Sequence, residues 1–574
     1  MRKRRSVLAA ILLSAMALTT ACGGSGGTTE TSGGGNVQAE AGSEAGNTGE
    51  ETVVQIGQTS EVANLNPTIQ PRTPDSNVQC MIFNYLVIPD EELNYVGDLA
   101  EGWDVSDDGR TYTFHLRDGV KWHDGEPFTS ADVAFTLTSL AAPTYKGGAD
   151  SRIVSIVGAK AYQEGSADSV SGITTPDDKT VVVELEEANA AFIGNMYTCI
   201  LPKHILENVD PGTWDTDDFN RHPIGTGKYK FVEWKSGQYI ELEKNEDYFG
   251  TKPSIDRVYV KFGDETTLTA SLINGELDVL YGLSASEIET VEAMGGVRVE
   301  AYDMLSVYYI GLNQLNEDLS DLKVRQALAY GIDKDKIVAT IYGETGYVQD
   351  SIFPSNHWTY SDDVTKYPYD PAKSKSLLEE AAYTMNASTG FYEKNGKTLH
   401  LTYDLVTSTD GNSVAQLIQQ QWKEIGVEME IIEQDFSTLA YTKLFPSDDN
   451  GSPRRVTAGG FAADSACYTL GFGMEADPDE YRMYLTTADA PGTWNFVTYS
   501  NSKVDELFEK QLYSTKPEER AACYHEIGKL ISEDVPWIPL YGKKSLAGVS
   551  EKVQNFAADF RGITFQIEKW NIAQ

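Results

Sequence analysis

The sequence between Leu99 and Leu140 reads LAEGWDVSDDGRTYTFHLRDGVKWHDGEPFTSADVAFTLTSL. Asp107-Asp108-Gly109 predicts a turn, because Asp tolerates turn geometry and Gly supplies a positive φ without a steric penalty. Across residues 111–116, aromatic and aliphatic side chains alternate with Thr and His, the period of two expected of a strand with one buried face. Thr129, with Asp132 three residues later, predicts the capped start of a helix. The segment therefore predicts strands joined by turns and followed by a helix.

This order of elements resembles the signature segment of the extracytoplasmic family 5 solute-binding proteins, the receptors of ABC importers for oligopeptides and dipeptides. A second landmark is residues 223–234, PIGTGKYKFVEW, which is similar to the family's PvGTGPYkf..w and has Lys228 where the family has proline. It is not a phosphate loop, because the Gly-Lys-Ser/Thr ending is missing and a strand rather than a helix is expected after it. The resemblance implies an α/β fold that is bilobed and periplasmic-binding-protein-like (type II, cluster C). It also implies mixed sheets, two interlobe crossings and an extra domain in the first lobe.

The chain is longer than a single hydrophobic core normally covers, which predicts two lobes or more. Residues 308–314 and residues 535–541 resemble the family's two crossings between lobes, and two crossings form a hinge. The expected boundaries are 1–21 for a signal peptide, 22–52 for a lipidated cysteine and flexible linker, 53–88 with 216–306 and 535–574 for domain I of the first lobe, 89–215 for domain II, the extra domain of the first lobe, and 307–534 for domain III, the second lobe.

Two features inside the expected second lobe bear on its fold. Residues 414–425 have helical apolar spacing and are followed by Gly426, while residues 427–431 alternate like a strand, so together they predict an α/β unit. Arg325 offers a cation for a ligand, but the resemblance implies that it is a buried structural arginine.

The first residues predict export. Arg2 to Arg5 form a basic stretch before an apolar run at 6–18, which is too short to span a bilayer as a permanent helix. Residues 19–22 resemble a lipobox, so lipidation of Cys22 is expected, with simple secretion as the alternative because Leu18 lies one place too far from the cysteine. The polar residues 23–51 predict a flexible tether. The expected location is the outer face of a bacterial cytoplasmic membrane, or the periplasm of a Gram-negative cell.

Charge and motifs exclude several functions. The chain has 46 Lys and Arg against 86 Asp and Glu, a net charge of −40, which disfavours nucleic acid and anionic lipid as partners. Beyond Cys22, four cysteines remain without metal-ligand spacing, and their disulfide state stays open. Because sequence motifs of catalysis are missing, the chain is expected not to be an enzyme, to use no cofactor and to bind no metal, with an extracellular hydrolase as the out-of-class alternative.

A receptor for many peptides must hold the backbone and the charged ends that all peptides share. In the resembling receptors, the carboxylate that binds the α-amino group lies just before a "DP" turn, which corresponds here to residues 470–481. Glu475 and Asp477 are the two candidates, and the alternative is a turn whose acids face solvent. The following segment adds Trp494, as an aromatic of the cleft or alternatively of the core, and Asn495 beside it. These four residues are the predicted ligand-binding residues.

The class of ligand is narrowed by a missing arginine. Dipeptide-type members carry an arginine at the start of the helix that ends here at Trp422, to pair with the ligand carboxylate, whereas this chain has Asn412-Ser413. Longer peptides, or a ligand without a carboxylate, are therefore expected, and Arg454-Arg455 is interpreted as a solvated loop rather than a distant cation for the ligand. Other members bind nickel chelates, glutathione, oligosaccharides or haem, which stay as alternatives. The resemblance implies a monomer that closes on its ligand and delivers it to an ABC permease and its ATPase subunits.

Overall fold

The computed structural model describes residues 51–69, 72–146, 153–444, 465–478, 484–486, 495–514 and 516–573. The compact unit to which they belong begins at Glu51. The predictions for the signal peptide, for Cys22 and its linker up to residue 50, for Arg454-Arg455 and for Trp494 lie outside the described residues.

The signature segment forms the predicted strands and helix. β4 (Ala100–Val105) and β5 (Thr111–Leu116) pair antiparallel on either side of Gly109, whose φ of 70° lies in the left-handed region that favours glycine. α2 (Ser130–Leu140) begins where the Thr129 N–H donates to the Asp132 carboxylate at 2.9 Å. With β7 (Thr180–Glu184) and β6 (Ile173–Asp177), these strands form a four-stranded sheet that packs on α2 over its own hydrophobic core.

A seven-stranded mixed sheet organises a second core. Its central strand β1 (Val53–Gln58) runs parallel to both neighbours, β10 and β11, while the outer pairs are antiparallel. Buried residues of β1 and β10, such as Val54, Val258 and Val260, lie in one cluster with residues of α1 (Thr73–Ile82). The remaining strands of the order β12-β22-β11-β1-β10-β9-β8 are β8 (Tyr229–Lys235), β9 (Tyr239–Lys244), β10 (Arg257–Phe262), β11 (Val279–Tyr281), β12 (Val297–Tyr302) and β22 (Ser545–Ser550).

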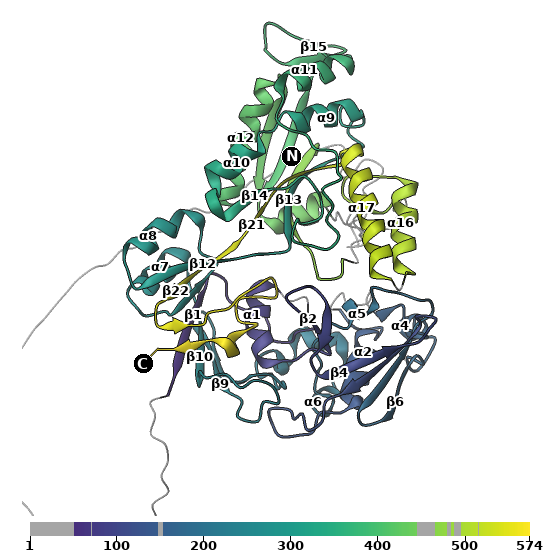
Figure 1. Ribbon diagram of the computed structural model, residues 1–574, viewed down its shortest axis with the longest axis vertical. Coiled ribbons are helices and arrows are strands. Elements are labelled where there is room, and N and C mark those ends of the chain that lie inside the picture. Colours follow the sequence, from purple (N-terminus) through teal and green to yellow (C-terminus); the bar gives the residue numbers. More distant parts are fainter. Residues whose placement is uncertain are drawn as a thin grey trace, which may run out of the picture. The chain divides into compact units, whose positions relative to one another are not determined.

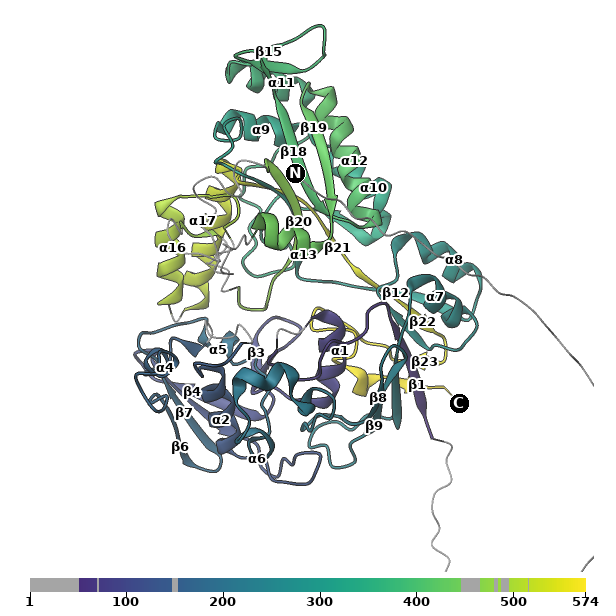
Figure 2. The same ribbon diagram turned by 180° about the vertical axis from the view of Figure 1, so that it is seen from behind.

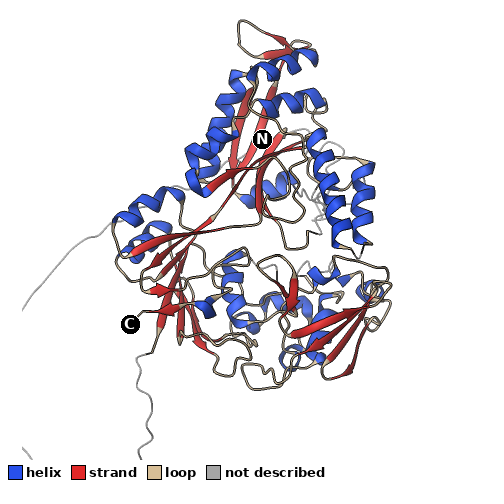
Figure 3. Cartoon of the chain, in the orientation of Figure 1, coloured by secondary structure: helices blue, strands red, loops and turns tan. Residues whose placement is uncertain are grey.

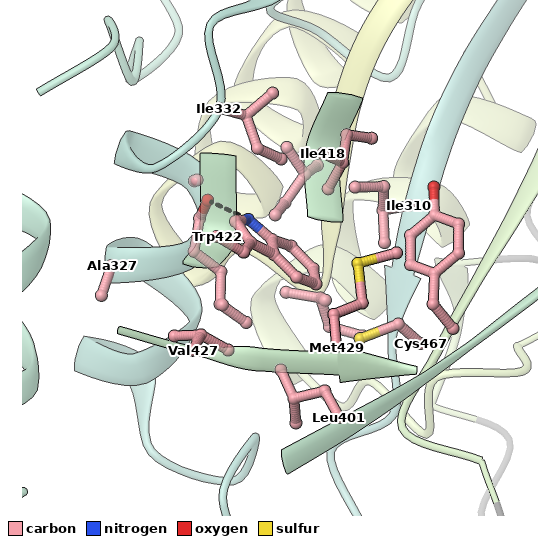
Figure 4. Packing of buried hydrophobic residues seen from close by; sticks show 14 of the residues in the cluster. Ile310, Ala327, Ile332, Leu401, Ile418, Trp422, Val427, Met429 and Cys467 are labelled. Carbon is pink, nitrogen blue, oxygen red and sulfur yellow. Dashed lines mark hydrogen bonds between the residues drawn. The ribbon is translucent and has the colours of Figure 1, made fainter. Parts of the chain in front are cut away.

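A six-stranded mixed sheet organises the second lobe. Its order is β14-β21-β13-β20-β18-β19, with β14 (Gly346–Val348), β21 (Trp537–Lys543), β13 (Ser306–Leu312), β20 (Cys467–Gly473), β18 (His400–Val406) and β19 (Glu428–Gln434). The predicted helix and strand are α12 (Thr409–Glu424) and β19, which lie alongside each other (Figure 2). Trp422 is fully buried, and its Nε1–H donates to the Leu328 carbonyl at 3.1 Å in the apolar core (Figure 4).

The chain passes between the two large sheets at two places (Figure 1). β12 of the seven-stranded sheet leads into β13 of the six-stranded sheet through residues 303–305, and β21 returns to β22 through Lys544. The return therefore lies at Lys544 rather than at the predicted boundary of 535, because β21 pairs with β13 and stays in the second lobe. Arg325 is the predicted structural arginine, since its guanidinium donates to the carbonyls of Leu319, Ser320 and Asp534.

Helices lie beside the strands of each large sheet (Figure 3). No helix within the described ranges is both long and apolar enough to cross a bilayer. The other helices are α1 (Thr73–Ile82), α4 (Ala159–Gln163), α5 (Phe192–Asn195), α6 (Lys203–Leu206), α7 (Glu265–Ile273), α8 (Ile288–Ala293), α9 (Leu322–Tyr330), α10 (Lys334–Ile341), α11 (Pro371–Glu380), α13 (Phe436–Leu439), α16 (Ser502–Leu512) and α17 (Pro517–Asp534). Small sheets pair β2 (Val87–Pro89) with β3 (Tyr95–Gly97), β16 (Tyr392–Lys394) with β15 (Thr384–Met385) and β17 (Lys397–Thr398), and β23 (Val553–Gln554) with β24 (Asn571–Ile572).

Candidate functional site

A cavity of about 590 Å³ lies where the chain crosses between the lobes, and we call it the main cavity. Its walls include Tyr302 at the end of β12, Met304 in the first crossing, and Met474 and Glu475 just after β20. The first lobe adds polar side chains from the start of α1 and the loop before it, and the aromatic rings of Tyr85 and Tyr197. The volume is in the usual range of a ligand pocket, roughly 300–1,000 Å³.

Glu475 is the predicted anchor residue that lines the main cavity with an exposed side chain. Its backbone is held by the two residues His357 and Trp358. The His357 Nδ1 accepts the Thr359 N–H at 3.2 Å, which leaves Nε2–H to donate to the Glu475 carbonyl at 3.0 Å. The Trp358 Nε1–H donates to the Ala476 carbonyl at 2.8 Å. The segment that presents Glu475 is therefore fixed from behind.

Burial lowers the pKa of His357 to about 4, so the imidazole is neutral at neutral pH and keeps the tautomer that donates to Glu475. Burial, and then the negative charges of Glu475 and Asp477, raise the pKa of the Tyr95 phenol from the first lobe. Tyr95 consequently stays protonated and neutral beside the two acids.

Asp477 forms an intramolecular ion pair in this structure. Both carboxylate oxygens accept from the Arg520 guanidinium, at 2.6 and 2.8 Å, and the two side chains are only 7% and 10% exposed. Arg520 also donates to Gln511 Oε1 at 3.1 and 2.9 Å. A bidentate, buried pair of this kind leaves no carboxylate oxygen facing the main cavity. The Asp477 carboxylate is therefore engaged within the protein, and Glu475 is the one of the two acids that lines the main cavity.

The Asn495 side chain also forms hydrogen bonds within the protein. Its Nδ2 donates to the carbonyls of Leu485 and Tyr499 at 2.7 and 2.8 Å, and its Oδ1 accepts the Tyr499 N–H at 3.0 Å. The side chain is buried and absent from the described walls of the main cavity. A ligand contact therefore needs a rearrangement of Asn495, whereas Trp494 lies outside the described residues.

The sequence patterns do not identify the aromatic residues of the first-lobe wall as ligand-binding residues. The rings of Tyr85 and Tyr197 stack with centroids 4.4 Å apart and planes at 25°, and Tyr281, Tyr302 and Phe560 also line the main cavity. An extended ligand can pack on such faces regardless of its sequence. With 31 tyrosines in the chain, pattern alone does not separate these rings from core rings. Tyr85 and Cys199 meet as partners of an isolated β-bridge, a long-range contact that leaves no local signal.

The charge of the described wall is that of a single exposed acid. Among the described wall residues, Arg561 is the one with a basic side chain. Its side chain is 7% exposed, and its guanidinium is bound to the Asp559 carboxylate. Within the described part of the chain, no three His, Cys, Asp or Glu side chains are arranged to hold a metal ion. Cys80, Cys199, Cys467 and Cys523 are buried and are not joined in disulfides. The arrangement therefore suits a ligand with a positive group and an extended, partly apolar body.

Two mixed β-sheets with helices beside them, two crossings between the lobes and a cavity at the crossings define the class of hinged solute-binding receptors. Residues 94–490 match the family model described as bacterial extracellular solute-binding proteins, family 5 middle. The chain belongs to this family of solute-binding proteins of ABC importers, and it is a receptor rather than an enzyme.

The relatives bind different solutes, as their names state. The oligopeptide-binding protein AppA of Bacillus subtilis is 30% identical over 533 residues, covering 90% of this chain and 91% of that one. Its structure in complex with a nonapeptide matches with a TM-score of 0.74 and 27% identity, covering 91% of this chain and 100% of that chain. NikZ of Campylobacter jejuni in complex with Ni(L-His) matches with a TM-score of 0.75 and 27% identity over 90% and 99% of the two chains. Heme-binding protein A of Haemophilus influenzae is 28% identical, covering 80% of this chain and 81% of its own.

Proposed function

We propose that this receptor captures oligopeptides in the main cavity, binds the peptide α-ammonium at Glu475, and delivers the peptide to an ABC permease. We also propose that it is anchored to the outer face of the membrane by lipid on Cys22. The observation that carries the ligand proposal is the exposed Glu475 carboxylate in the cavity wall, on a backbone fixed by His357 and Trp358.

A buried ammonium needs a charged partner, and a carboxylate is the one that the described wall offers. The other end of the ligand finds no equivalent there, because Arg561 is already bound to Asp559. A peptide long enough to place its carboxylate beyond the main cavity meets both conditions, whereas a dipeptide does not. The complex of the relative AppA with a nonapeptide supports this choice of ligand length.

Capture depends on a closed state in which the two lobes contact each other and the ligand contacts both lobes. Tyr95 of β3 accepts the Asp477 N–H at 3.3 Å. Nearby, the Ala190 N–H donates to the Leu512 carbonyl at 2.7 Å, and the Tyr513 hydroxyl donates to Glu187 at 2.8 Å. A ligand that touches both lobes favours the state in which these contacts exist. Moving a 1:99 equilibrium to 99:1 needs roughly 5.5 kcal/mol of preference, which a few charge-assisted contacts supply.

The experiment has two arms. Native mass spectrometry of the protein from residue 52 onward, purified from cells and then denatured, is expected to release a set of peptide masses. Calorimetric titration with one such peptide and its N-acetylated form is expected to show at least about tenfold weaker binding of the acetylated form, or about 1.4 kcal/mol. Glu475→Gln removes this difference, while Glu344→Gln, an exposed glutamate outside the main cavity, keeps it.

Other results would overturn the proposal. Release of sugar, haem or a nickel chelate instead of peptides would keep the family and change the ligand. Equal affinity for free and acetylated peptide in the unmodified protein would reject Glu475 as the ammonium anchor.

A further inference from the structure

A second cavity, of about 250 Å³, adjoins the main cavity, and we call it the side pocket. Tyr85 and Arg561 line both cavities, so the two are neighbours in the first lobe. The side pocket is more polar than a gap in a core, because Asn84, Asp98, Lys228 and Gln566 contribute to its wall. The proposed function gives this pocket no role.

The cations of the side pocket are already paired. Lys228 Nζ lies 2.6 Å from the Glu568 carboxylate, and the two side chains are 13% and 19% exposed. Lys569 lies 3.2 Å from Glu91. Arg561 is bound to Asp559. These three pairs neutralise the lysine and arginine side chains of the described wall. They also engage the carboxylates of Glu91 and Glu568, so that Asp98 is the acid of the described wall that is outside these pairs.

Asp98 is held by neutral donors. Its two carboxylate oxygens accept from Asn84 Nδ2 at 3.1 and 3.0 Å, and one of them accepts the Tyr85 N–H at 2.9 Å. Among the described residues, no lysine, arginine or histidine forms an ion pair with this carboxylate. Burial raises its pKa, whereas the hydrogen bonds from the Tyr85 N–H and Asn84, and then the charges of Lys228 and Arg117, act in the opposite direction. The Arg117 Nε–H donates to the Asp98 backbone carbonyl at 2.5 Å rather than to its carboxylate. A cation brought to the pocket would supply the missing partner and remove part of this desolvation penalty.

We propose that the side pocket is a specificity subsite that receives a lysine or arginine side chain of the bound peptide, with Asp98 as its counter-ion. The proposal rests on the proposed function, because the peptide that places this side chain is the one bound in the main cavity. The aliphatic stem of the incoming side chain packs on the ring of Tyr85 at the boundary between the cavities, while its charged end reaches Asp98. The receptor would then select basic peptides by position as well as by length.

The test uses nonapeptides with a free amine, a serine–alanine background and one variable position. At each position, lysine is compared with norleucine, which has a similar stem without the charge. Calorimetry of the unmodified protein is expected to show one position at which lysine binds at least about tenfold tighter. Asp98→Asn keeps an oxygen for the Tyr85 N–H and is expected to bring the two peptides within about twofold, without weakening the norleucine peptide. Asp104→Asn, an exposed carboxylate on β4, serves as the matched control and is expected to keep the preference.

A second variant covers the case in which Asp98→Asn does not fold. Glu568→Gln leaves Lys228 without its ion-pair partner, so lysine is expected to lose its advantage at that position and glutamate to gain affinity. Tight binding that depends on Glu475 but shows no lysine preference at any position would overturn the subsite and leave the proposed function intact. Absence of any peptide binding would overturn both.

Discussion

Arg520→Met tests whether Asp477 is a structural residue. The substitution keeps the apolar stem of the side chain but removes both hydrogen bonds to Asp477 and both to Gln511. Because the Asp477 side chain is 7% exposed, water does not readily replace the guanidinium. Removing one partner of such a buried pair costs about 3–5 kcal/mol. Asp477→Asn is expected to cost less, about 1.5–3 kcal/mol, since Arg520 keeps Gln511 and an amide oxygen.

Urea unfolding of the single and double variants, followed by tryptophan fluorescence, measures these losses. Trp358 is a suitable reporter because its ring faces Arg520 at 5.4 Å. The double variant is expected to lose less than the sum of the single variants, by about 2 kcal/mol or more. Lys516→Ala removes an exposed pair with Glu519 beside the same helix, and is expected to change stability by less than about 1 kcal/mol. A loss below about 1 kcal/mol for Arg520→Met, or additive losses, would refute the structural role.

Three further predictions concern other parts of the molecule. Stability is expected to fall as pH drops from about 6.5 to 4, because unfolded His357 binds a proton that the folded residue, with its pKa lowered to about 4, does not. Urea titrations across this range should show His357→Gln reducing the slope, by at most about 1.4 kcal/mol per pH unit, and an unchanged slope would contradict the assignment. Tyr95→Phe removes the acceptor of the Asp477 N–H, so peptide is expected to leave about two- to tenfold faster in stopped-flow fluorescence, and an equal rate would show that this contact adds nothing to closure. Cys22→Ser is expected to release the protein from membranes into the medium on cell fractionation, whereas retention on the membrane would reject the lipid anchor.

Local signals were sufficient for the parts of the fold that local chemistry decides. The turn at Gly109, the alternation in β5 and the Thr129–Asp132 cap were all readable, because each depends on residues a few positions apart. The predicted return crossing at 535 lies earlier in the chain than the observed one at Lys544, for the opposite reason. An apolar strand such as β21 is expected in either lobe, and only its pairing with β13, more than two hundred residues earlier in the chain, assigns it to the second.

The site shows the same limit at the level of single side chains. Glu475 and Asp477 stand two positions apart and carry the same charge, so sequence left both as candidate anchors. Arg520 pairs with Asp477, and it lies 43 positions away on another element. Asn495 likewise is interpreted differently once its bonds to Leu485 and Tyr499 are known. The side pocket combines residues that are far apart in the chain, from Cys80 to Lys569, and no sequence pattern links them.

The two crossing segments are joined to each other by strand pairing on both sides, and this pairing limits how the two sheets can move. β12 pairs antiparallel with β22 up to Tyr302 and Ser545, and β13 pairs antiparallel with β21 from Tyr308 and Tyr541 onward. The chain between the lobes is thus a single two-stranded ribbon that is hydrogen-bonded on both sides of a short gap. A ribbon of this kind bends across its flat face but resists sliding, because a slip of one residue would turn every side chain to the other face. The strand pairing on both sides of the gap therefore favours bending of the ribbon as the motion that joins the two sheets, and it disfavours sliding of one crossing strand past the other.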